Sequence, residues 1–238
     1  MAATSIGPVS NHRPTNVWTR WSRAIREFLH SGGARGNAWQ ALPSYAPALL
    51  IALCGLTYGA IMGGYNGITG DRAIMVVYGA LKVPMLFLVT MLIAVPCFYV
   101  LNLLLGVGDD FRQVWKALVD YQLSVAMQLV ALAPATLFVN ASNDDYRIAL
   151  VWSTLLFAVT GWNAQRSLNA GYSALVVTNP THAYLRRFWF VLYAFVGIQM
   201  GWDLRPFVGS PYMPVQFFRD HIGNAYTETL RAFLTMLH

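Results

Sequence analysis

Residues 83–105 read VPMLFLVTMLIAVPCFYVLNLLL and contain no charged side chain. A helix needs about 20 mostly apolar residues to cross the hydrocarbon core of a bilayer, which is about 30 Å thick. This stretch is long enough and apolar enough to do so. It therefore predicts a membrane span, and with it an integral membrane protein.

The composition of the whole chain agrees with this prediction. Apolar residues make up 56% of the 238 residues and charged residues only 11%, whereas soluble domains carry about 25% charged residues. A soluble fold of this size could not cover its surface with so few charges. The composition also argues against a disordered chain, a disulfide scaffold and a nucleic-acid binder, although the net charge is +6.

Four further apolar stretches predict spans, at residues 46–63, 121–139, 148–164 and 188–202. We therefore expect an all-α polytopic bundle of about five transmembrane spans. Residues 170–178 are apolar but too short to cross a bilayer, so they either extend the fourth helix or form a re-entrant segment. The predicted domains are an inner N-terminal segment (1–45), the five-span bundle (46–203), and an outer proline-rich loop with an amphipathic C-terminal helix (204–238).

The orientation follows from the positive charges. With the N-terminus inside, the inner segments hold ten Lys and Arg residues and the outer segments six, which favours this arrangement by the positive-inside rule. The first long apolar run starts only near Ala46, so we expect no cleavable signal peptide. The expected location is the bacterial inner (cytoplasmic) membrane, with the N-terminus cytoplasmic and the C-terminus outside.

Both flanks have amphipathic helical patterns. Residues 15–30 place an apolar stripe containing Trp18 and Trp21 opposite Arg20, Arg23 and Arg26, a pattern typical of a helix lying in the membrane interface. The alternative is a helix packed on its own inner loops. After Pro214, helical spacing returns, and this C-terminal stripe either covers the protein's own spans or docks a partner. Its candidate docking residues are Phe218, Ile222, Tyr226, Leu230 and Phe233.

The first span carries small residues four apart, at Gly55, Gly59 and Gly63. This spacing lets another helix approach closely, within the chain or between subunits. At the predicted outer edge, Lys82 and Asp203 form a candidate ion pair between the second and fifth spans. The alternative is that the two side chains reach separately into the headgroups.

The sequence predicts no catalytic, cofactor-binding or metal-binding residues. The five histidines lie outside the predicted spans, which disfavours haem held between helices. Cys54 and Cys97 lie in apolar runs without a CxxC spacing, so neither a disulfide framework nor a zinc site is expected. The patterns GxxxxGK[ST], HExxH and GxSxG are all absent, which removes the common signatures of nucleotide-binding proteins and hydrolases.

Residues 101–132 (LNLLLGVGDDFRQVWKALVDYQLSVAMQLVAL) and 151–177, with Trp152, Gly161 and Gly171-Tyr172-Ser173-Ala174, resemble the Yip1-domain family of five-span membrane proteins. The resemblance covers roughly residues 46–203 and rests on pattern. It implies an inner N-terminus and an outer or lumenal C-terminus. Eukaryotic members act in membrane trafficking with small GTPases, but the acidic DLYGP-like motif of those members is missing here, so GTPase binding is not implied.

The sequence supports two hypotheses about function. The first is a non-enzymatic, Yip1-like membrane scaffold or accessory subunit, whose partners are the lipid bilayer and other membrane proteins or copies of itself. The rival is a small-solute or ion permeation protein with Gln128 and Gln199 lining a path.

Overall fold

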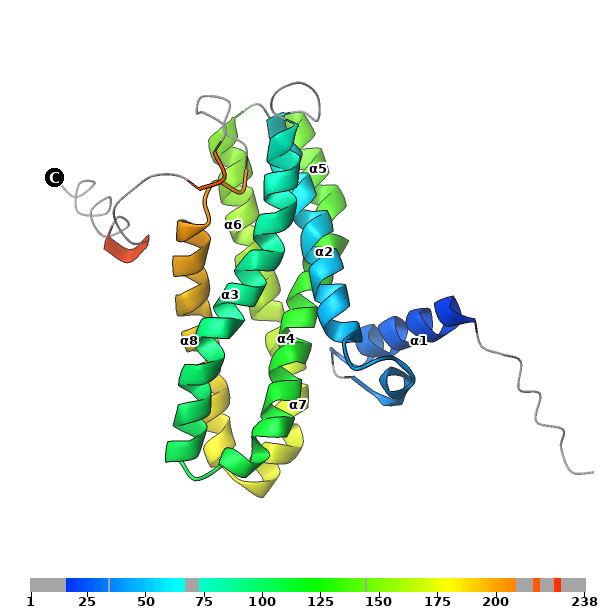
Figure 1. Ribbon diagram of the computed structural model, residues 1–238, viewed down its shortest axis with the longest axis vertical. Coiled ribbons are helices and arrows are strands. Elements are labelled where there is room, and N and C mark those ends of the chain that lie inside the picture. Colours follow the sequence, from blue (N-terminus) through cyan, green and yellow to red (C-terminus); the bar gives the residue numbers. More distant parts are fainter. Residues whose placement is uncertain are drawn as a thin grey trace, which may run out of the picture.

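The computed structural model describes residues 16–33, 35–66, 73–143, 145–208, 216–218 and 225–227. Every regular element within these ranges is helical, which confirms the all-α prediction. The helices run lengthwise in one bundle, and α1 lies across its direction (Figure 1). Their bounds are α1 Val17–His30, α2 Ala46–Gly63, α3 Ile74–Leu104, α4 Phe111–Ala131, α5 Ala133–Ser142, α6 Tyr146–Asn163, α7 Gln165–Thr178 and α8 Thr181–Asp203, with short 3-10 turns at Asn37–Ala41, Gly64–Asn66 and Gly108–Asp110.

Two helices of the described part, α2 and α3, are long and apolar enough to cross a membrane. A third candidate is a broken span made of Gly108–Ala131 and Ala133–Ser142, which are bent by 43°. The break precedes Pro134, which stands in the first turn of α5, a position where proline's missing N–H is tolerated. The structure therefore supports two or three spans by this measure, and the fourth and fifth stay predictions.

The helix bounds refine the predicted ones. The first predicted span coincides with α2, whereas α3 begins at Ile74 and α8 at Thr181, each several residues earlier than predicted. The segment 170–178 belongs to α7, which continues α6 after a break at Ala164. It is thus an extension of the fourth helix.

Glycines fix the tightest helix pair, α2 against α3. A Cβ placed on Gly59 would lie 2.2 Å from the Gly79 carbonyl oxygen, and one on Gly63 would lie 2.2 Å from that of Met75. Gly55 faces the ring of Pro84. All three predicted packing glycines therefore meet α3 of their own chain, at a distance that only a missing side chain allows.

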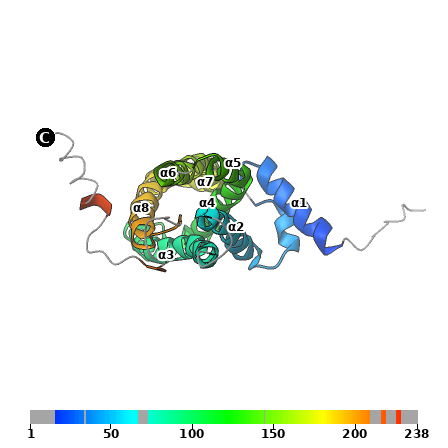
Figure 2. The same cartoon turned by 90° about the horizontal axis from the view of Figure 1, so that it is seen from above.

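Aromatic side chains fill the centre of the bundle. Tyr58 of α2 meets Phe157 of α6 with ring centroids 5.9 Å apart, and Phe98 of α3 meets Trp189 of α8 at 5.1 Å. Seen from above, α8 lies between α3 and α6, and α1 lies outside the bundle (Figure 2). The core is thus filled by side chains from helices on opposite sides of the bundle.

Helix α3 is much longer than α2, so it extends past the end of α2 and the bundle has two sections. At about 1.5 Å per residue, the 18 residues of α2 span about 27 Å and the 31 residues of α3 about 46 Å. Helix α2 begins at the height where α1 crosses the bundle (Figure 1). Beyond α1 lies a section built from the end of α3, the start of α4, α7 and the start of α8. We call it the inner section, after the side on which the sequence predicts these residues.

Candidate functional site

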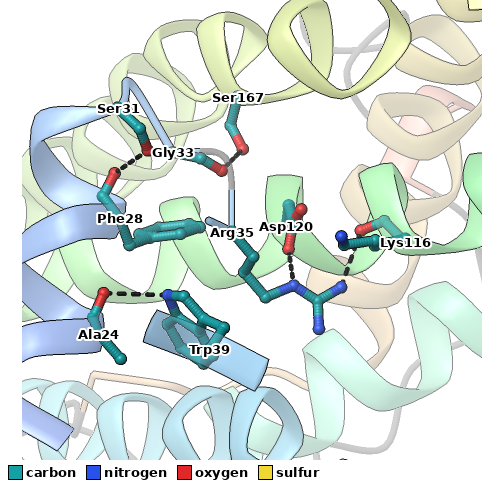
Figure 3. Close-up of polar contacts among 9 residues, drawn as sticks. All are labelled: Ala24, Phe28, Ser31, Gly33, Arg35, Trp39, Lys116, Asp120 and Ser167. Carbon is teal, nitrogen blue, oxygen red and sulfur yellow. Dashed lines mark hydrogen bonds and ion pairs between the residues drawn. The ribbon is translucent and has the colours of Figure 1, made fainter. Parts of the chain in front are cut away.

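The N-terminal segment docks on α4 and α7 at a place that we call the inner junction (Figure 3). Arg35 is the centre of it: its Nε donates to Asp120 Oδ1, and its Nη2 donates to the Lys116 carbonyl oxygen at 3.2 Å. The Arg35 side chain is 16% exposed and that of Asp120 only 4%. A charge pair this buried holds strongly, because losing either partner would leave the other charged and unpaired.

The turn after α1 brings this segment onto α7. Gly32 and Gly33 adopt φ angles of 73° and 95°, which belong to the left-handed region that glycine enters without strain. The N–H of Gly33 donates to the Phe28 carbonyl at 2.9 Å, which closes the helix end as in a Schellman motif. The Gly33 carbonyl accepts a hydrogen bond from Ser167 Oγ of α7.

The segment is also fastened to α1 itself. Trp39 is buried, its Nε1–H donates to the Ala24 carbonyl at 2.9 Å, and its ring meets Phe28 edge-on at 5.8 Å. The backbone N–H of Ala38 donates to Glu27 Oε2 at 2.8 Å. These contacts orient α1 across the bundle.

The predicted interface residues lie on the outer surface of α1. Arg20, Arg23 and Arg26 are exposed, and Trp18 is 80% exposed, while Trp21 is half-buried against the cluster around Phe28. One part of its apolar stripe therefore packs on the protein, and another part, with Trp18, faces outward. The placement of this helix in the membrane interface stays a prediction.

Next to the inner junction a groove opens between α6, α7 and α8, with a volume of about 460 Å³. We call it the inner groove and define it by its lining residues: Trp162, Asn163, Gln165, Arg166, Asn169, Arg187, Phe190 and Val191. A second cavity of about 210 Å³ lies under α1 and shares Asn163 and Arg166 with the groove. Among the described residues, the lining of both cavities includes arginine, amide and apolar side chains but no acidic one.

A chain of polar side chains lines the second cavity and reaches the groove at Asn163. Asn163 Nδ2 donates to Gln128 Oε1 at 2.7 Å, and Gln128 Nε2 donates to Ser124 Oγ at 2.9 Å. Gln128, which the sequence places on a hypothetical permeation path, is therefore held between α4 and α6. Gln199, the other such residue, donates to Asp203 at 3.0 Å and accepts from the Ala225 N–H at 3.1 Å.

A histidine is buried at the inner end of the bundle, which no pattern in the sequence predicts. His182 is fully buried, its Nε2 lies 3.0 Å from Asp110 Oδ2, and its ring lies 6.1 Å from that of Tyr172. Burial raises the pKa of the Tyr172 hydroxyl above its ordinary range, an effect that the positive charge of Arg186 partly opposes. Nothing in the spacing of these residues along the chain indicates that they meet.

Lys82 and Asp203 have different partners. Lys82 is a fully buried residue of α3. Its Nζ donates to the Pro206 carbonyl at 2.7 Å and lies 5.0 Å from the centre of the Phe217 ring. The Asp203 carboxylate accepts from Gln199, and the ion pairs within the described ranges do not include these two residues. The lysine thus fastens the loop after α8 onto α3.

Of the candidate docking residues at the C-terminal end, Phe218 is 52% exposed. Tyr226 stacks on Phe195 of α8 at 4.5 Å and its hydroxyl donates to the Phe195 carbonyl at 2.6 Å. Ile222, Leu230 and Phe233 lie outside the described residues. The Tyr226 contact is therefore with the protein's own α8.

Among the residues that the structure describes, no three or more His, Cys, Asp or Glu side chains gather closely enough to hold a metal ion. Comparison of the chain with protein-family models, with curated proteins and with solved structures found no match.

Proposed function

We propose that this chain is a non-enzymatic scaffold or accessory subunit of a membrane protein complex, similar to Yip1-domain proteins. In this proposal α2, α3, the α4–α5 pair, α6 and α8 form five spans of the bacterial inner membrane. Helix α1 lies on the cytoplasmic surface and the C-terminus lies outside. The Yip1 likeness rests on the sequence pattern alone.

Outward-facing apolar side chains support the embedding in a membrane. Leu88 and Leu92 of α3 are each more than 60% exposed, as are Val151 of α6 and Val191 of α8. A soluble monomer rarely exposes so continuous an apolar surface, whereas lipid is a suitable neighbour for it. The exposed basic face of α1 would meet the anionic headgroups beside it.

The single observation that carries the scaffold proposal is the apolar surface of the inner section. Helix α3 is about 46 Å long, which exceeds the roughly 30 Å hydrocarbon thickness, yet its last turns still expose Val100, Leu103 and Leu104. Leu104 is 78% exposed. In this proposal α1 marks the membrane surface, so the end of the predicted span 83–105 lies on its inner side and not in lipid. Exposed apolar residues there are typical of a protein–protein contact.

The permeation alternative draws support from the polar pair of Gln128 and Asn163, which lines the cavity that adjoins the inner groove. Against it, the interior beyond is filled by rings such as Tyr58, Phe87 and Phe157, whose centroids lie 5.9–6.5 Å apart. A path for water or ions would need these rings to separate.

The test is extraction of the full chain from its native membrane in a mild detergent, followed by mass measurement of the intact complex. We expect partner proteins in fixed ratio with the wild type and with the matched control Leu92→Ser, a lipid-facing position on the same helix. Leu104→Ser should lose the partners. A chain that emerges alone in all three cases contradicts the proposal, and Gln128→Ala flux measurements in liposomes would then test permeation.

A further inference from the structure

The inner groove has two cationic walls. Arg166 comes from α7 and Arg187 from α8, both side chains are exposed, and both line the same cavity. Within the described residues neither arginine makes an ion pair. Two guanidinium groups that share an acid-free cavity repel each other, and this arrangement is favourable when an anion lies between them.

The other polar groups of the groove suit a phosphate. Arginine presents several N–H donors in a plane and binds phosphate oxygens in a bidentate way. The amide groups of Asn163 and Asn169 supply further donors beside them. Gln165 also lines the groove, and its Nε2 is buried with no hydrogen-bond partner among the described residues. A buried donor left unsatisfied favours a ligand that can accept from it.

The groove also has an apolar exit. Trp162, which is 72% exposed, and Val191 line it on the side that continues along α6 and α8. On α6 the exposed residues Val151, Leu155 and Val159 repeat every four positions and lead away from Trp162 toward the outer end. Such a stripe suits a hydrocarbon chain.

The groove lies close to α1. The adjoining cavity, which shares Asn163 and Arg166 with the groove, is lined by Phe28 and Leu29 of α1. Since α1 is the amphipathic helix that would lie in the membrane interface, the groove lies at headgroup height. Basic pockets between spans at this height suit anionic lipid headgroups.

We propose that the inner groove binds the phosphate of an anionic phospholipid between Arg166 and Arg187, with the acyl chains along the apolar stripes of α6 and α8. This inference rests on the membrane embedding proposed above. A free phosphate would share the same donors but would leave the apolar exit unused, so the phospholipid is the occupant that the groove favours.

The experiment is native mass spectrometry of the purified full chain with added phosphatidylglycerol or phosphatidylcholine. We expect the wild type to retain phosphatidylglycerol preferentially, and the Arg166→Gln, Arg187→Gln double variant to bind it about 25-fold more weakly, or about fivefold for each arginine. Arg112→Gln, an exposed arginine of α4 on the same inner side, is the matched control and should bind as the wild type does.

Equal retention by the double variant and the wild type would overturn the inference. So would displacement of the lipid by an equal concentration of inorganic phosphate, which would assign the site to the free anion. Alkaline washing of membranes separates this failure from failure of the proposed function. If the wild type leaves the membrane, the embedding is wrong, whereas if both proteins stay and lipid retention is equal, only the lipid site is wrong.

Discussion

Replacing Gly59 by alanine should separate α2 from α3. The added Cβ would lie 2.2 Å from the Gly79 carbonyl oxygen and 3.0 Å from the Ala80 Cα, well inside the 3.4 Å at which ordinary van der Waals contact begins. Both neighbours are backbone atoms of a helix, so neither can turn away as a flexible side chain would. The two helices must move apart along their whole contact.

The expected cost follows from two opposing terms. Overpacking a tight contact costs about 1–3 kcal/mol, and a clash with backbone lies at the upper end of that range. Alanine recovers about 1 kcal/mol because it favours helix over glycine. The net loss in the free energy of unfolding is therefore about 2 kcal/mol, which lowers the melting temperature of a chain this size by about 4–8 °C.

Thermal unfolding in detergent, followed by size-exclusion chromatography of the heated samples, measures this shift. The matched control is Gly201→Ala in α8, where an added Cβ meets nothing within 4 Å. Since only the helix preference changes there, its melting temperature should stay equal or rise slightly. If both variants melt together with the wild type, the close approach of α2 and α3 is refuted.

Three further predictions concern the two ends of the bundle. Asp120→Asn leaves Arg35 buried without its anionic partner, so the N-terminal segment should loosen by about 3 kcal/mol or more, seen as faster hydrogen exchange and protease cleavage there; unchanged exchange would refute the role of the pair. Trp39→Phe keeps an aromatic ring, although a smaller one, and removes the indole N–H that donates to the Ala24 carbonyl. The lost hydrogen bond should cost about 1 kcal/mol in thermal unfolding, and a larger loss than for Trp39→Ala would contradict this role. Lys82→Met should leave the Pro206 carbonyl without this donor and raise hydrogen exchange in the loop after α8, whereas an unaltered loop would mean that the lysine does not hold it.

The sequence predicts the bounds of a span most accurately where a run of apolar residues alone determines them. Residues 46–63 form α2 as predicted, because a run of apolar residues with a proline near its start has few other stable arrangements in lipid. Helix α3 begins at Ile74, earlier than the predicted span 83–105, which starts after the charged residue Lys82. In the structure the helix runs through this residue, and the loop after α8 satisfies its ammonium group.

The inner junction could be predicted only in part. The sequence predicts the amphipathic helix α1. Arg35 and Asp120, however, are separated by 85 positions, and no local pattern indicates that they pair. The same holds for His182 and Asp110, which are 72 positions apart. Such pairs depend on how the helices pack, and their residues read separately as surface charges at the ends of helices.

In the proposed topology the chain crosses the membrane five times, and the accessibility of two engineered cysteines tests this number directly. In a protein whose native Cys54 and Cys97 are replaced by alanine, Ser142→Cys lies at the exposed end of α5 and Thr178→Cys at the exposed end of α7. Five spans predict that an impermeant thiol reagent added outside intact cells labels the first cysteine and reaches the second only after the cells are opened. Labelling of both from outside would mean three spans, labelling of neither would mean two, and either result would contradict the account.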